Sequence, residues 1–520
     1  DPLRRTFFKT IQSIFFPRRS RLGRGRIPLL TTGERVALTG LLLFILAVRT
    51  IQADQPIVEN YVGRQVPTAM VARNHERGSG FFRPELDTAP LPNLFLVEPP
   101  LFEAAAVGLR RATGWPLERS GRLVSGLAMV LGGWGLFGLA RRREGARVAL
   151  LALAAFAVFP VTIRYGRAFQ PDALMLGALL AGLRCIDEHR SGGGGAWLIV
   201  GGAWLATGLA LKVVAAYVLV PLIAAIVRPP RVRAIAPALM LLAPALLWYG
   251  YAATRLAEGG GSRASADNGA IWLRVLVPTA WFRIETLRSV ARFLLVRGFT
   301  PLGLALAVGG FLARPGGDRL WAIWGASALA ALAALAGKLH HEYYFLALAP
   351  VAAVEVGRAL ATLADRSRAA AVAAGGGVLV LALALTGSTW RTPPEWASLP
   401  EAARAVRAHV PATDWVVAPE ALLFASDRRG CRLEFTRPAA RRAAGEWGAE
   451  LAIDDPVALL EFYRAHGARF VADVADGVDA DPARRALHQA IRRRYNVLLD
   501  RPDVLLARLT PSSRLPDGTR

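Results

Sequence analysis

The sequence predicts a mostly α-helical protein that crosses a membrane many times and ends in a soluble α/β domain. Of its 520 residues, 53% are hydrophobic, and many lie in uncharged runs of roughly 15 to 20 residues. Short arginine-rich loops separate these runs, as expected for loops on the cytoplasmic side of a membrane. After about residue 390 the pattern changes to short amphipathic segments, which are typical of a soluble domain.

The net charge narrows the class of protein. A soluble chain with a formal charge of +24 would suggest a nucleic-acid partner. Here the arginines alternate with apolar runs and the mean hydropathy is +0.34, so membrane lipid is expected as the partner and nucleic acid is not. The two cysteines, Cys185 and Cys431, allow neither a disulfide framework nor a cysteine metal site.

The topology follows from the basic loops. Residues 1–30 are rich in arginine and are interpreted as a cytoplasmic segment lying on anionic lipid. The loops RRREGAR, RCIDEHRSGGGG, RPPRVR, RPGGDR and ADRSR are placed on the same side. Eleven spans then fit, near 36–51, 122–140, 148–163, 172–187, 196–211, 213–227, 234–252, 296–313, 320–337, 343–360 and 369–389.

An odd number of spans places the two ends of the chain on opposite sides of the membrane. Residues 31–390 are expected to form the transmembrane domain, with a large first outer loop at 52–121. Residues 391–520 are expected to form a soluble α/β domain on the outer face, periplasmic or extracellular, of a multi-pass protein of the inner (plasma) membrane.

The C-terminal segment has a readable order of elements. DWVVA, RFVADVA, NVLLD and VLLARL are predicted strands, and ALLFAS, DPVALLEFYRAHGA and ARRALHQAIRRRY are predicted helices. The sequence shows no nucleotide-binding loop there. His409, His466 and His488 are each interpreted as surface or capping residues rather than ligands.

The first outer loop carries acidic residues in a partly apolar setting. TAMVARN predicts a short helix on the membrane surface, and Pro99 and Pro100 predict the start of a second helix. Asp87 and Glu98 lie at loop and helix-start positions beside apolar sequence, where a carboxylate can be tuned as a base. The alternative is that both are solvated loop acids.

Polar residues also gather between the spans on the outer side. Arg164, Arg167 and Asp172 lie at a tight turn, Lys212 lies at another, and KLHHEYYF, which begins with Lys338, joins two spans. Because arginine dominates this chain, two lysines at the outer boundary indicate a specific role such as phosphate binding. The alternatives are snorkelling lysines and an aromatic interface belt. Adjacent residues on a helix point about 100° apart, which disfavours a metal site at His340, His341 and Glu342.

The order of these motifs resembles a known family. RQ..TA..ARN, P.LD, E.PLF, R...PD, a lone lysine between tight spans and HHEYY...L.P are similar to the bacterial branch of the GT-C membrane glycosyltransferases. That branch includes dolichyl-phosphate-mannose protein mannosyltransferase-like and aminoarabinose transferase-like proteins. The resemblance implies transfer of a sugar from a polyprenyl-phosphate donor to an acceptor hydroxyl on the outer face, with an acid of the first loop as base.

The resemblance and the chemistry assign roles to residues. Many relatives carry an Asp-Glu pair early in the loop, where this chain has Arg64 and Gln65. Asp87 is therefore the first candidate for the catalytic base, because it lacks stabilising groups in the sequence, followed by Glu98 and then Asp54. Asp172 and Gln65 are candidates for substrate binding, and the lipid phosphate is assigned to Arg64, Arg167, Lys212, Lys338, His340, His341 and Tyr344.

A transporter or lipid flippase is the alternative function. Such proteins usually carry polar or broken segments near the bilayer midplane, whereas the polar residues here crowd one boundary. No cofactor beyond the lipid-linked sugar donor is required by this interpretation, and dependence on a divalent metal stays open. The sequence identifies neither the sugar nor whether the acceptor is a glycan, a lipid or a protein.

Overall fold

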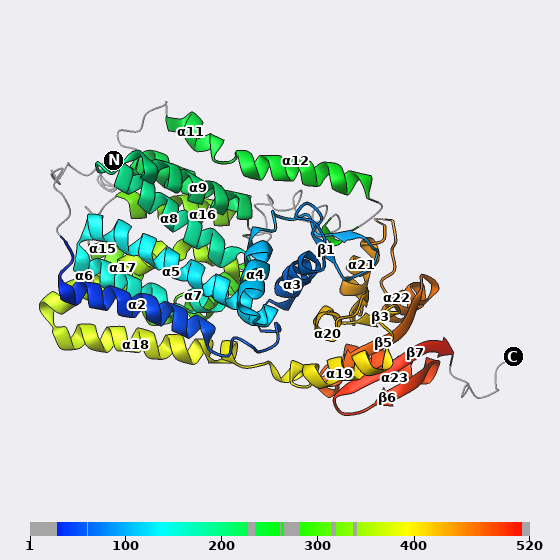
Figure 1. Cartoon of the computed structure of the whole chain (residues 1–520). Coiled ribbons are helices and arrows are strands. Elements are labelled where there is room, and N and C mark those ends of the chain that lie inside the picture. The colour runs from blue at the N-terminus through cyan, green and yellow to red at the C-terminus, as the bar shows by residue number, and fades with distance from the viewer. Residues whose placement is uncertain are drawn as a thin grey trace, which may run out of the picture. The chain divides into compact units, whose positions relative to one another are not determined.

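The computed structural model describes residues 29–59, 61–226, 234–259, 262–264, 281, 283–313, 319–335, 341–448 and 450–511. The chain divides into two compact units (Figure 1). The first contains Asp1–Ile51, Arg122–Trp248 and Arg274–Gly387, and the second contains Gln52–Gly121, Tyr249–Leu273 and Ser388–Arg520. Nearly all of the predicted cytoplasmic segment 1–30, the loop RPPRVR and most of RPGGDR lie outside the described residues.

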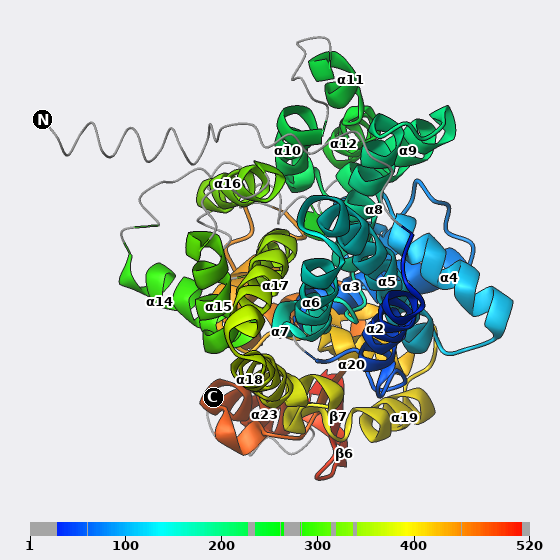
Figure 2. The same ribbon diagram turned by 90° about the vertical axis from the view of Figure 1, so that its left-hand side faces the viewer.

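The first unit is built of helices. Figure 2 shows α6, α17 and α18 of this unit nearly end on. In chain order the α-helices are α2 (Thr32–Thr50), α5 (Leu117–Glu144), α6 (Ala146–Val158), α7 (Pro160–Tyr165), α8 (Asp172–Arg190), α9 (Gly195–Leu211), α10 (Leu219–Pro221), α11 (Ile235–Met240), α12 (Ala243–Glu258), α14 (Ile284–Arg292), α15 (Pro301–Ala313), α16 (Arg319–Ala334), α17 (Ala349–Arg366) and α18 (Arg368–Thr386). Tighter or wider helical turns are η1 (Val213–Val218), η2 (Leu222–Ile226), η5 (Phe293–Gly298), η7 (Glu342–Leu348) and η8 (Gly387–Trp390). α5, α12 and η8 each include residues that belong to the second unit.

Small residues allow these helices to pack closely. A Cβ atom added to Gly177 of α8 would lie 2.3 Å from the Ala128 carbonyl oxygen of α5. A Cβ atom added to Gly310 of α15 would lie 2.0 Å from the Glu355 carbonyl oxygen of α17. Backbones that approach this closely are typical of helix pairs within membranes, where packing replaces the hydrophobic effect between helices.

The predicted spans fall on these helices, but most of the helices are short. By length and apolar composition, three helical stretches of the described chain are sufficient to cross a membrane: Leu117–Glu144, Glu342–Arg366 and the stretch that begins at Arg368. A fourth arises if Ile284–Gly298 and Pro301–Ala313, which meet at 96°, form one broken span. Eleven crossings therefore stay a prediction.

The second unit begins with the segment predicted as the first outer loop. It contains α3 (Val62–Glu76), β1 (Glu85–Leu86), β2 (Asn93–Leu94) and α4 (Leu101–Thr113), and β1 pairs antiparallel with β2. Pro100 is the N-cap residue of α4, so the predicted helix start at Pro99 and Pro100 is confirmed. The predicted helix at TAMVARN lies within α3.

The C-terminal part of this unit is a mixed five-stranded sheet with helices. Its strands lie in the order β4-β3-β5-β7-β6; β3 is parallel to β4 and β5, and β7 is antiparallel to β5 and β6. The strands are β3 (Trp415–Ala418), β4 (Gly430–Arg432), β5 (Ala468–Val474), β6 (Tyr495–Asp500) and β7 (Val504–Pro511). The helical elements are η9 (Pro394–Trp396), α19 (Leu399–His409), α20 (Glu420–Ser426), α21 (Arg437–Gly445), α22 (Pro456–Ala465), η10 (Val478–Ala480) and α23 (Pro482–Arg494).

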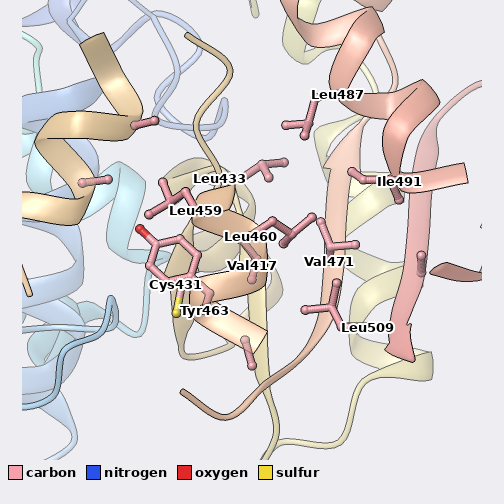
Figure 3. Close-up of a cluster of buried hydrophobic side chains, with 14 of the residues drawn as sticks. Val417, Cys431, Leu433, Leu459, Leu460, Tyr463, Val471, Leu487, Ile491 and Leu509 are labelled. Carbon is pink, nitrogen blue, oxygen red and sulfur yellow. The ribbon is translucent and has the colours of Figure 1, made fainter. Parts of the chain in front are cut away.

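The core of this unit joins the two segments of the chain. Val417, Val471, Leu487 and Leu509 are among its buried side chains (Figure 3), and Ala89 of the loop segment belongs to the same cluster. The Ala89 amide donates to the Gly430 carbonyl, and Thr88 forms a parallel bridge with Gly430. The loop segment and the tail thus share one core. This grouping differs from the predicted division into residues 31–390 and 391–520, and those boundaries stay predictions.

His488 is not the surface or capping residue that the sequence suggested. It is fully buried, and its Nε2 lies 2.7 Å from Oδ2 of Asp473 on β5. Arg484 donates to both oxygens of the same carboxylate, at 2.7 and 2.8 Å. The expectation was wrong because the buried acid lies on a strand 15 residues earlier, and the sequence around His488 shows only a basic helix.

Candidate functional site

A pocket in the first unit gathers some of the polar residues that the sequence analysis singled out. It encloses about 360 Å³ of space between atoms, part of it open to solvent. Asp172 and Lys212 line it together with Tyr343 and Tyr344. The remaining lining is largely aliphatic and comes from Met175, Val214, Ala328, Ala331, Leu332, Leu335 and Ala347, with Tyr217.

Lys212 reaches this pocket because the helix ends immediately before it. α9 stops at Leu211, Lys212 is extended with φ −154° and ψ 110°, and η1 starts at Val213. The ammonium lies 2.7 Å from Oδ1 of Asp172 and 4.1 Å from the ring centroid of Tyr343. A cation between a carboxylate and an aromatic face is held by charge and by the ring quadrupole.

Asp172 is fixed by the start of α8. It is in the first turn of that helix, where the helix dipole favours a carboxylate. Its Oδ2 accepts a hydrogen bond from Gln170 Nε2 at 2.9 Å, and its side chain is only 2% exposed. Asp172 is thus the partner of Lys212, and the two residues that the sequence placed at separate turns form one ion pair.

The aromatic side of the pocket comes from the HHEYY segment. His341 stacks on Tyr343 with ring centroids 5.3 Å apart and planes 9° apart, and Tyr343 contacts Tyr344 at 4.6 Å. The Tyr165 ring lies edge-on to Tyr343 at 5.7 Å. These contacts hold the Tyr343 ring against the Lys212 ammonium.

Glu342 anchors this segment from behind. Its Oε1 accepts hydrogen bonds from the Tyr165 hydroxyl and from Arg297 Nη2, both at 2.7 Å. Arg297 also contacts Oε2 of Glu342. Both oxygens of Glu342 therefore have partners within the protein. We interpret Glu342 as a residue that holds the neighbouring Tyr343 in position.

The other residues assigned to the lipid phosphate lie elsewhere or are not described. Arg167 is fully buried and is not among the residues that line the pocket. Arg64 contacts Glu98 in the second unit. Arg164, which the sequence analysis noted at the same turn as Arg167 without a phosphate role, donates to the Leu385 carbonyl. Lys338 and His340 lie outside the described residues.

The second unit contains the candidate bases, and Asp87 is not the isolated acid that the ranking assumed. It is fully buried; its Oδ2 accepts from Arg73, and its Oδ1 accepts from Arg77 and Asn74, each at 3.3 Å. Arg429 lies 3.7 Å from Oδ1. Arg73, Asn74 and Arg77 lie at the end of α3 or directly after it, 10 to 14 residues before Asp87, and Arg429 follows α20. Local spacing did not reveal that the chain folds back to bring them to Asp87.

Glu98 lies beside a second buried acid. Arg64 contacts Oε1 of Glu98, while Oε2 accepts no hydrogen bond from the residues described. Glu103 on α4 is 4% exposed, and its Oε2 has no hydrogen-bond partner in the described chain. Burial, together with the nearby Glu98 carboxylate, raises the pKa of the Glu103 carboxyl to about 8, so Glu103 is largely protonated at neutral pH.

Asp54 and Gln65 complete the candidates in this unit. The side chain of Asp54 is 51% exposed, and both its oxygens are bound by Arg119, one at 2.7 Å. Gln65 is fully buried, and its Nε2 donates to the Glu59 carbonyl at 2.6 Å. In the part of the chain that the structure describes, no three His, Cys, Asp or Glu side chains converge as metal ligands would.

The sequence reasoning missed four polar residues: Glu59, Glu103, Tyr217 and Arg297. Glu59, which is 1% exposed, precedes α3 in the first loop. The resemblance to a family with acids early in this loop could have singled it out. Glu103 shares the buried face of α4 with Phe102, Ala106 and Val107, so helical spacing would have placed it inside. Tyr217 and Arg297 lie in apolar stretches without a motif.

The chain is similar to known glycosyltransferases in sequence and fold. The family model for dolichyl-phosphate-mannose-protein mannosyltransferases matches residues 98–249. ArnT from Cupriavidus metallidurans bound to undecaprenyl phosphate has a TM-score of 0.63 at 14% identity, covering 92% of this chain and 99% of ArnT. No curated protein sequence matches the chain.

Two larger proteins have a similar fold. The archaeal oligosaccharyltransferase AglB from Archaeoglobus fulgidus, in complex with an inhibitory peptide and a dolichol-phosphate, gives a TM-score of 0.54 at 14% identity, covering 90% of this chain and 73% of AglB. The mycobacterial arabinofuranosyltransferase AftD gives 0.50 at 16% identity, covering 95% of this chain and 41% of AftD. The resemblance to the GT-C superfamily that the motifs indicated is confirmed by these matches.

Proposed function

We propose that this protein is an integral-membrane glycosyltransferase. It transfers a sugar from a polyprenyl-phosphate-linked donor to an acceptor hydroxyl on the outer face of the membrane. The donor is the only cofactor the proposal requires, and the protein is placed in the inner (plasma) membrane with its N-terminus in the cytoplasm.

The pocket around Lys212 is the observation that carries this proposal. Ala328, Ala331, Leu332 and Leu335 have the spacing of one face of α16 and its end, so they form an aliphatic wall. The Lys212 ammonium and the Tyr343 and Tyr344 rings supply a cation and polar edges in the same pocket. A ligand suited to both parts has a hydrocarbon chain and an anionic head, as a polyprenyl phosphate does.

The comparisons support the same ligand class. ArnT was crystallised with undecaprenyl phosphate, and AglB was solved with a dolichol-phosphate. Both of these ligands, undecaprenyl phosphate and dolichol-phosphate, are polyprenyl-type lipids with a phosphate head. None of the similar structures named above is a transporter, so the alternative of a transporter or flippase receives no support from them.

The chemistry divides into two tasks. The acceptor oxygen attacks the anomeric carbon and forms the new glycosidic bond, while the bond from that carbon to the phosphate oxygen breaks. A carboxylate takes the acceptor proton, and the departing polyprenyl phosphate leaves with the electron pair of the broken bond. Lys212 stabilises this phosphate as its charge develops, assisted by a hydrogen bond from the Tyr344 hydroxyl.

The base is assigned to Glu98 in place of Asp87. A general base needs a free oxygen to receive the proton, and both oxygens of Asp87 and of Asp54 are bound by arginines. Glu98 keeps Oε2 without a hydrogen bond from the described residues, while Arg64 holds Oε1. Arg64 then orients the base, which is a different role from the phosphate contact predicted for it.

Single-turnover transfer separates these candidates. Glu98→Gln is expected to bind the lipid donor normally and to lose about 100-fold or more in rate, because the amide keeps the shape but accepts no proton. Asp54→Asn and Asp87→Asn serve as matched controls, and Glu59→Gln tests the acid that the sequence reasoning missed. Normal turnover in Glu98→Gln together with loss in any one of the others would move the base to that residue.

The sugar and the acceptor can be identified in cells. Mass spectrometry of cell-envelope glycans is expected to show one sugar that disappears without the gene and returns with the wild-type chain. The same sugar should not return with a chain that carries Lys212→Met and Asp172→Asn together. An unchanged set of glycans in all strains would contradict the proposed function.

A further inference from the structure

A buried hydroxyl in the pocket has no assigned role. Tyr217 lies on η1, five residues after Lys212, and its side chain lines the same pocket. The residue is 9% exposed, and its hydroxyl is buried without a hydrogen-bond partner among the described residues. Leaving a buried polar group without a partner is unfavourable, so such groups are normally hydrogen-bonded.

The surroundings of Tyr217 hold its ring in place. The ring centroid lies 6.2 Å from that of Trp324, which is fully buried on α16. The Trp324 indole donates to the Ala347 carbonyl at 2.8 Å, and Ala347 also lines the pocket. Trp324 precedes Ala328 by one helical turn, so Tyr217 packs against the same face of α16 that forms the aliphatic wall.

Among the described residues, no acceptor meets the Tyr217 hydroxyl, so a ligand in the pocket is its candidate partner. Most of the lining near Tyr217 is aliphatic, and the polar groups of the pocket already have partners: Asp172 binds Lys212 and Gln170, and Lys212 faces Tyr343. A phenol donates a single hydrogen bond and carries no charge. Its best partner in an apolar setting is an anionic oxygen, because hydrogen bonds to charged acceptors are the stronger ones.

We propose that the Tyr217 hydroxyl is a substrate-binding group that donates a hydrogen bond to the phosphate of the lipid carrier, beside Lys212. This inference rests on the proposed function and adds a second neutral donor, besides the Tyr344 hydroxyl, to the Lys212 ammonium. Lys212 attracts the phosphate by its charge. The Tyr217 hydroxyl fixes the orientation of the phosphate, since the Tyr217 ring is held by Trp324. Removal of the hydroxyl should therefore weaken binding of the phosphate without disturbing the wall that contacts the chain.

Tyr217→Phe tests this directly, because it deletes one oxygen and leaves the ring. Binding of farnesyl phosphate and of farnesol to the purified full-length protein is measured for the wild type and the variant. The expected result is a loss of roughly ten-fold or more in affinity for farnesyl phosphate, and a smaller change for farnesol. Tyr463→Phe, which removes a phenol oxygen in the other unit, is the control and should bind both probes as the wild type does.

Each outcome has a distinct meaning. If the wild type binds farnesyl phosphate no better than farnesol, the proposed function fails and the inference fails with it. If the wild type prefers farnesyl phosphate and Tyr217→Phe binds it equally well, only the inference is overturned. An equal loss for both probes also overturns it, since the hydroxyl would then serve the chain or the protein rather than the phosphate.

Discussion

Replacing Lys212 by methionine has two separable effects. Methionine keeps most of the hydrocarbon stem and removes the ammonium, which is 2.7 Å from a carboxylate whose side chain is 2% exposed. Breaking a buried pair by removing one partner typically costs 3 to 5 kcal/mol of folding stability, because the other charge is left without compensation. Loss of a donor to the developing phosphate charge adds about 2 to 4 kcal/mol to the barrier, or roughly 30- to 1,000-fold in rate.

A double substitution separates the two effects. Asp172→Asn removes the stranded charge, so Lys212→Met with Asp172→Asn replaces an ion pair by two neutral groups. Such replacements are often nearly neutral for folding. We therefore expect the double variant to unfold close to the wild-type temperature, while its rate of sugar transfer stays at least about 30-fold below the wild-type rate.

The assay combines thermal unfolding with single-turnover transfer for the wild type, both single variants and the double variant. Asp172→Asn alone is the matched control, because it keeps the lysine and removes its partner. The reasoning is refuted if the double variant recovers both stability and transfer, for Lys212 would then serve only to neutralise Asp172. If Lys212 only snorkelled to the lipid headgroups, the double variant would likewise transfer sugar at the wild-type rate.

Three further substitutions test other parts of the structure. Because burial raises the pKa of Glu103 from 4.5 to about 8, ionisation of this carboxyl increasingly destabilises the folded state as pH rises between these values. Glu103→Gln should therefore change the free energy of unfolding little near pH 4.5 and increase it at pH 8, by up to about 5 kcal/mol. An equal difference at both pH values in thermal unfolding would contradict this. A Cβ atom at Gly430 would lie 1.8 Å from the Val416 carbonyl oxygen, so Gly430→Ala should destabilise the sheet by about 3 kcal/mol or more, whereas Gly445→Ala, with open space around it, should be nearly neutral in the same assay. Gly177→Leu should push α8 away from Ala128 on α5 and lower the yield of folded protein; a normal yield would show that the close approach is not required.

The elements that the sequence predicted correctly have strong local patterns. β3, β5, α22 and α23 follow from alternating or helical spacing of apolar residues, and α4 follows from two prolines at its start. β4 was missed because it spans only Gly430–Arg432, too short to show a period. Its pairing with Thr88 joins residues more than 300 positions apart, which no local pattern can reveal.

The site was predicted in part, for the same reason. Lys212, Asp172 and the HHEYY tyrosines were each picked out by residue type and position at the ends of apolar runs, and the structure places them in one pocket. The ranking of Asp87 was wrong in its premise, because three arginines contact its carboxylate. Arg73 and Arg77 precede it by 14 and 10 residues across a turn that local spacing does not reveal, and Arg429 comes from a distant segment. The role proposed for Tyr217 could not be predicted from the sequence. It rests on a hydroxyl without a partner among the described residues, which only the structure shows.

The central claim is sugar transfer with release of the lipid phosphate. The most direct measurement places the purified protein in liposomes with a polyprenyl-phosphate-linked sugar and an envelope extract as acceptor. The free polyprenyl phosphate and the glycosylated product are then quantified by mass spectrometry. The account predicts equal amounts of both, formed by the wild type and not by the Lys212→Met and Asp172→Asn double variant. Movement of the intact lipid-linked sugar between leaflets, with no polyprenyl phosphate released, would contradict it and identify a flippase instead.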